Sequence, residues 1–239
     1  MFGVPNSIGI LNKINNFVRK DKNNKKYQAI FTPPFTLLES FSKYFTKKAI
    51  KIGAQNCYHK DIFSSNTGAI SSYMIKNVGA KYVIIGHSDN RFEGDTNQIL
   101  KSKVAYSLKN NLKVIFCIGE NKKEKRKNLT SNILKNQISK VIERKFNQNN
   151  LILAYEPIWS IGTGKVPSEK ELIRTIKLIK KTLKKIFGTK KIPKVLYGGS
   201  VDSKSIKVFK KINELDGFLI GGASKSSKNF IDIIKNYYR

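Results

Sequence analysis

The segment LILAYEPIWSIGTGKVP, residues 151–167, decides how the rest of the chain is interpreted. It begins as an apolar run typical of a buried β-strand and meets a carboxylate, Glu156, where that strand should end. Pro157 cannot donate to a sheet and favours an extended backbone at Glu156, so the strand stops there. Trp159 and a glycine-rich tail, residues 162–165, follow. The segment predicts either a catalytic base followed by a mobile lid, or an ordinary strand with a surface glutamate and a glycine turn.

Short apolar, β-branched runs alternate with helical patterns along the whole chain. We expect strands over residues 28–31, 50–54, 82–85, 114–118, 151–155, 194–197 and 217–220. We expect helices over residues 8–19, 132–146 and 168–187. The last of these begins with a capping box, in which Ser168 precedes Glu171 by three residues. Apolar strands joined through helices indicate a parallel sheet covered by helices, and no linker divides residues 1–239, so we expect a single domain.

Two architectures fit this alternation, an open doubly wound sheet and a closed (β/α)8 barrel. A doubly wound sheet would place a glycine fingerprint after its first strand, where this chain has Thr32-Pro33-Pro34. Polar residues and glycines instead follow several strands, namely Gln55, Asn56, His87, Ser88, Glu120, Glu156, 198–200 and 221–222. Because the active-site face of a barrel has this distribution, we predict a (β/α)8 barrel. Only seven strands are found, so we expect the N-terminal first strand to be lacking.

The charge is strongly basic, with 46 Lys and Arg against 16 Asp and Glu and a net charge of +30. A nucleic-acid-binding protein is one interpretation, and a drift in composition that coats helices with lysine is the other. Without a zinc-finger or recognition-helix pattern we favour the second and expect no specific nucleic-acid partner. The chain has no 18-residue apolar run and no signal pattern, so we expect a cytoplasmic protein without a membrane partner. Cys57 and Cys117 are expected to be reduced thiols rather than metal ligands.

His87 follows the apolar run 82–85, where a histidine is suited to acid–base or electrophilic work, although a lone histidine is more often structural. Its convergence with Glu156 on one barrel face favours the functional interpretation. Two glycine-rich turns, residues 198–200 and 221–224, end the last two strands. Barrels commonly hold a phosphate on backbone N–H groups in these two positions. Either turn alone could be a plain tight turn, and the pair favours a phosphate site.

Seven motifs together closely resemble those of triosephosphate isomerase. They are GAQNC at 53–57, GHS at 86–88, CIGE at 117–120, AYEPIW at 154–159, IGTGK at 161–165, YGGS at 197–200 and GFLIGGAS at 217–224. The resemblance covers nearly the whole chain. It implies interconversion of dihydroxyacetone phosphate and glyceraldehyde 3-phosphate in glycolysis and gluconeogenesis, without a metal or cofactor. Glu156 would move the proton and neutral His87 would polarise the carbonyl, as is known for this family.

The resemblance also implies which residues hold the substrate. They are Gly162, Ser200, Leu219, Gly221 and Gly222. Residues 157–165 would form a lid that closes over the site and excludes water. A homodimer is implied as well, with Thr67 near the active site of the partner subunit.

The sequence departs from the family pattern at its start. Family members carry an Asn and a catalytic Lys at the end of the first strand, and here Met1-Phe2-Gly3 matches the turn just after that lysine. Loss of such an oriented charge costs about a hundred- to a thousandfold in rate. We therefore expect this exact chain to be poorly active and prone to associate through the strand edges that the lacking first strand would leave unpaired. The alternative is a degenerate barrel that binds phosphate ligands without turnover. Two smaller departures are Asp89, where glutamate is usual, and Ala69 in the dimer loop.

Overall fold

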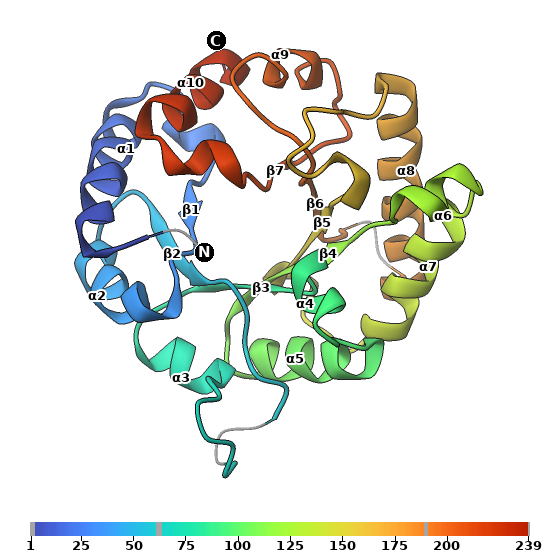
Figure 1. The fold of residues 1–239 in the computed structure, drawn as a ribbon, viewed down its shortest axis with the longest axis horizontal. Coiled ribbons are helices and arrows are strands. Elements are labelled where there is room, and N and C mark those ends of the chain that lie inside the picture. The colour runs from blue at the N-terminus through green and yellow to red at the C-terminus, as the bar shows by residue number, and fades with distance from the viewer. Residues whose placement is uncertain (1–2, 61–63, 189–190, 239) are drawn as a thin grey trace.

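The computed structural model describes residues 3–60, 64–188 and 191–238. Its strands lie inside a ring of helices (Figure 1). They are β1 (Ile30–Phe31), β2 (Lys51–Ala54), β3 (Tyr82–Ile85), β4 (Lys113–Ile118), β5 (Leu151–Tyr155), β6 (Lys194–Tyr197) and β7 (Gly217–Phe218). Neighbouring strands are parallel, and their order in the sheet is their order in the sequence. All seven coincide with predicted runs, although β1 and β7 are shorter than predicted because each pairs with only one neighbouring strand among the described residues.

The helices cover the outside of the sheet (Figure 1). They are α1 (Ile8–Lys20), α2 (Phe35–Phe45), α3 (Ser72–Asn77), α4 (Ser88–Phe92), α5 (Asn97–Lys109), α6 (Lys122–Arg126), α7 (Thr130–Val141), α8 (Glu169–Phe187), α9 (Ile206–Phe209) and α10 (Ser227–Tyr238). The capping box at the start of α8 is confirmed, since Ser168 accepts from the N–H of Glu171. The predicted helix over 132–146 was too long. Its backbone becomes extended at Ile142, which is buried and turns the chain toward the core.

Two apolar layers follow from the alternation of side chains along each strand. Outward-facing residues such as Val83 and Ile85 pack with the helices in the main core. Inward-facing residues form a smaller cluster inside the sheet, where Tyr82 and Ile84 pack with Ile115. This two-layer packing is the architecture of a (β/α)8 barrel.

Over the described residues, no strand pairs the outer edges of β1 and β7. A cavity of about 570 Å³ lies between those edges and extends into the sheet. Its lining is largely apolar and includes Phe31, Ile84, Leu196, Phe218 and Phe230. The described chain therefore supplies seven strands of an eight-stranded architecture.

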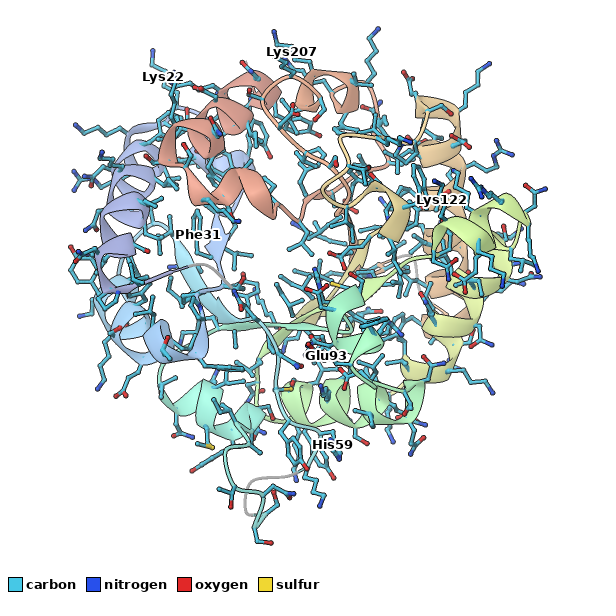
Figure 2. All side chains as sticks on the ribbon, in the orientation of Figure 1. Lys22, Phe31, His59, Glu93, Lys122 and Lys207 are labelled. Atoms are coloured by element: carbon cyan, nitrogen blue, oxygen red, sulfur yellow. The ribbon has the colours of Figure 1, made fainter. Side chains whose placement is uncertain are left out.

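The outer surface carries much of the positive charge. Lys22, Lys122 and Lys207 extend outward from the ring of helices (Figure 2). This distribution agrees with lysine as a coat on the solvent side of the helices. In the described ranges no helix has the length and apolar character needed to cross a bilayer.

Candidate functional site

Glu156 lies at the carboxyl end of β5, with only 4% of its surface exposed. Its backbone N–H donates to the carbonyl of Ile118 on β4, which extends the strand pairing by one residue. Burial raises the pKa of the Glu156 carboxyl above its usual range, and the neighbouring imidazole of His87 partly offsets this shift. The carboxylate is thus a stronger base than an exposed glutamate.

His87 brings its imidazole to Glu156 from the end of β3. The His87 Nε2 atom lies 3.5 Å from Oε1 of Glu156. At the other ring nitrogen, Nδ1 accepts from the backbone N–H of Asp89 at 3.3 Å. Because Nδ1 acts as an acceptor, the proton of the neutral ring is on Nε2, which faces the site. The Asp89 carboxylate lies 3.4 Å from Nδ1 but is 80% exposed, so solvent screens its charge.

A buried cysteine and a partly buried arginine on neighbouring elements support the carboxylate. The Cys117 thiol of β4 hydrogen-bonds Glu156, and burial raises its pKa well above the usual value, so the thiol stays protonated as a donor. The guanidinium of Arg91 donates to the carbonyls of Gly86 and Cys117 at 2.8 and 2.9 Å. These bonds tie the ends of β3 and β4 together beside the site.

Two glycines make the space that Glu156 occupies. A Cβ on Gly119 would lie 1.8 Å from the carbonyl oxygen of Glu156, and a Cβ on Gly198 would lie 2.6 Å from its Cγ. No non-bonded contact of a carbon atom with oxygen or with carbon tolerates these distances. The backbone of the two adjacent strands therefore forms the walls around the base.

The lid, residues 157–165, leaves β5 through the short 3-10 helix η4 (Ile158–Ser160). Two of its residues contact the loop after β6, where the Ser200 hydroxyl donates to the Ser160 carbonyl at 2.6 Å and accepts from the Gly164 N–H at 3.1 Å. Gly162 and Gly164 adopt left-handed backbone conformations with φ of 68° and 72°. The lid thus turns sharply and touches one of the predicted phosphate-binding residues.

The remaining predicted substrate residues follow β7. Leu219 lies beside Gly198, since a Cβ on Gly198 would be 3.4 Å from the Leu219 Cβ. Gly221 and Gly222 open the 3-10 helix η5 (Gly222–Lys225) and are exposed. A Cβ on either glycine would meet open space, so packing within the protein does not require glycine at these positions. A residue without a side chain lets a ligand approach the backbone closely, which is a reason for glycine at these two positions.

Three features of the site were not predicted. Cys117 was interpreted only as a reduced thiol, and Arg91 was not singled out. Glu120 was noted at a strand end without a role, and it is fully buried, accepting from Tyr155 Oη at 3.2 Å and from Trp159 Nε1 at 2.9 Å. It anchors the start of the lid. The signal in the sequence was a carboxylate between apolar strands, because a buried carboxylate needs hydrogen-bond donors.

Among the described residues, no group of three His, Cys, Asp or Glu side chains could hold a metal ion.

Comparison with known proteins agrees with this geometry. The family described as triosephosphate isomerase matches residues 6–237. The triosephosphate isomerase of Dictyoglomus thermophilum is 35% identical over 93% of this chain and 91% of its own length. That of Thermodesulfovibrio yellowstonii is 38% identical over 85% and 83%. The crystal structure of the Bartonella henselae enzyme superposes with a TM-score of 0.90 at 29% identity, covering 100% of this chain and 96% of that one.

Proposed function

Since this chain belongs to the triosephosphate isomerase family, we propose that Glu156 and His87 carry its isomerisation of triose phosphates. The reaction interconverts dihydroxyacetone phosphate and glyceraldehyde 3-phosphate. The observation that supports the assignment is the pair itself: a buried carboxylate 3.5 Å from a ring nitrogen at the ends of two parallel strands. A base and a hydrogen-bond donor at this separation can act on adjacent atoms of one small substrate.

In this proposal Glu156 takes a proton from the carbon beside the substrate carbonyl. His87 donates a hydrogen bond from Nε2 to the carbonyl oxygen, where negative charge develops as the enediolate forms. Glu156 then returns the proton to the neighbouring carbon, which completes the conversion between ketose and aldose. The raised pKa of Glu156 favours the first step, because a carboxylate in a water-poor site holds the proton more tightly.

The substrate phosphate would bind between the lid and the loops after β6 and β7. Gly162, Ser200, Gly221 and Gly222 would offer N–H and hydroxyl donors, and Leu219 would pack beside them. Support comes from the contact of Ser200 with Gly164, which already joins the lid to one of these loops. Closure over the phosphate would exclude water from the enediolate.

A homodimer in the cytoplasm, where glycolysis takes place, completes the proposal. Residues 64–70 project away from the barrel near α3 (Figure 1), and Thr67 on this segment is exposed. Phe92, at the end of the helix that begins after His87, is 94% exposed, and Met74 on α3 is 48% exposed. Large apolar side chains in such positions are suited to an interface with a second subunit.

The test is a coupled isomerase assay on this chain beside its Glu156→Gln variant. We expect turnover that falls about 10²- to 10⁴-fold in the variant, because the general base is removed. The reduced turnover expected from the sequence is tested alongside, with a version extended at the N-terminus by a strand that carries Asn and Lys. Phosphate-ligand binding without turnover in both versions would support the degenerate barrel instead.

A further inference from the structure

Lys125 contacts the first part of the lid and the helix that follows the lid, and it has no role in the reaction described so far. Its Nζ atom, on α6, lies 4.2 Å from the ring centroid of Trp159. The same atom lies 3.2 Å from Oε1 of Glu171. Trp159 belongs to η4 at the start of the lid, and Glu171 to the first turn of α8, just after the lid ends. One ammonium group therefore links the start of the lid to the helix that follows its end.

Both partners of Lys125 are themselves held in place. The indole N–H of Trp159 donates to the buried Glu120, so the ring is held at its edge by Glu120 and over its face by the cation. Oε2 of Glu171 accepts from the N–H and hydroxyl of Ser168, which leaves Oε1 for Lys125. The backbone hydrogen bond from Ser168 lowers the pKa of Glu171, so this carboxylate is charged at neutral pH.

We infer that Lys125 is a positioning residue that holds the lid in the conformation in which Gly164 meets Ser200. The inference rests on the proposed function, because it concerns the lid of that same site. Without the cation, the Trp159 ring loses the group over its face and the start of α8 loses its link to α6. The lid should then spend more time away from Ser200.

A lid that opens during turnover has a chemical consequence. In water the enediolate expels its phosphate: the electrons of the enediolate form a new double bond as the carbon–oxygen bond to phosphate breaks. Inorganic phosphate leaves with the bonding electron pair, and the remaining enol takes up a proton at carbon to give methylglyoxal. Phosphate released per isomerisation event therefore measures lid opening, because exclusion of water is what suppresses this loss.

The experiment compares Lys125→Met with a matched control, Lys122→Met, an exposed lysine on the same helix (Figure 2). Methionine removes the charge and keeps an unbranched apolar stem. Trp159 is the only tryptophan in the sequence, so its fluorescence reports on the lid alone. Acrylamide is the quencher, because a neutral molecule is unaffected by the change in net charge.

In Lys125→Met we expect phosphate release per isomerisation to rise about three- to tenfold, with a clear rise in acrylamide quenching of Trp159. Lys125→Arg, which keeps a cation for both partners, should restore both values, and Lys122→Met should match the unsubstituted chain. Equal values in Lys125→Met and Lys122→Met would overturn the inference. Absence of isomerase activity in both the unsubstituted chain and its extended version would instead count against the proposed function, while the quenching comparison would still decide the role of Lys125.

Discussion

Replacing Gly198 with alanine tests whether the position of Glu156 controls the reaction. A Cβ at residue 198 would lie 2.6 Å from the Glu156 Cγ, where ordinary van der Waals contact begins at 3.4 Å. The glutamate side chain must therefore retreat by about 1 Å. The new Cβ would also lie 3.4 Å from the Leu219 Cβ, so the alanine itself has no free direction in which to move.

A shift of this size in a positioned base costs about 10²-fold in rate. The loss should appear in kcat rather than KM, since Gly198 is not among the proposed phosphate ligands. A coupled assay in both directions measures both constants, and a thermal melt shows that the variant folds. Gly9→Ala is the control, because a Cβ at this exposed position of α1 meets nothing within 4 Å. If Gly198→Ala folds and keeps kcat within threefold of the unsubstituted chain, the position of Glu156 does not limit the reaction and our reasoning fails.

Four further predictions test the fold and the site. Glu156→Gln should raise the melting temperature at neutral pH while activity falls. Burial raises the pKa of Glu156 in the folded state, so the folded state loses stability as the pH rises above the ordinary pKa of a glutamate. Glutamine carries no charge and removes this loss. Because the pKa of Glu156 is raised, kcat/KM should begin to fall on acidification at a pH above the pKa of an ordinary glutamate, and a pH–rate profile measures this. Lys103→Met removes a buried cation and leaves the partly buried Asp95, 2.7 Å away, without it, which should cost about 3 kcal/mol and lower the melting temperature by about 10 °C. The apolar cavity between β1 and β7 should make the chain associate with rising concentration in analytical ultracentrifugation and bind a hydrophobic dye, and a strictly dimeric, dye-free chain would contradict this.

Most of the fold could be predicted because buried parallel strands are near-continuous apolar runs. β3, β5 and β6 coincide with the predicted ranges to the residue. The end of α7 could not be predicted, since helical periodicity continues through Phe146 while the backbone turns extended at Ile142. That turn is set by the packing of both residues in the core, which local sequence does not show.

The predicted pair at the centre of the site, Glu156 and His87, was accessible from sequence because parallel strands bring their carboxyl ends to one edge. The role of Cys117 was not, because it depends on register. Cys117 pairs with Ala154, and Glu156 lies two residues further along β5 on the same face. A shift of one residue between β4 and β5 would turn the thiol to the helices, and the sequence of either strand alone allows both arrangements.

The same register explains why glycine is needed on both sides of Glu156. Gly119 follows β4 and Gly198 follows β6, and each places bare backbone against the glutamate. A side chain at either position would displace the carboxylate, or would open the site to water and lower its pKa toward the ordinary value. A base that is both buried and fixed therefore requires neighbours without side chains. Gly119 and Gly198, which lie against the base on either side, are therefore as specific to the chemistry as Glu156 itself.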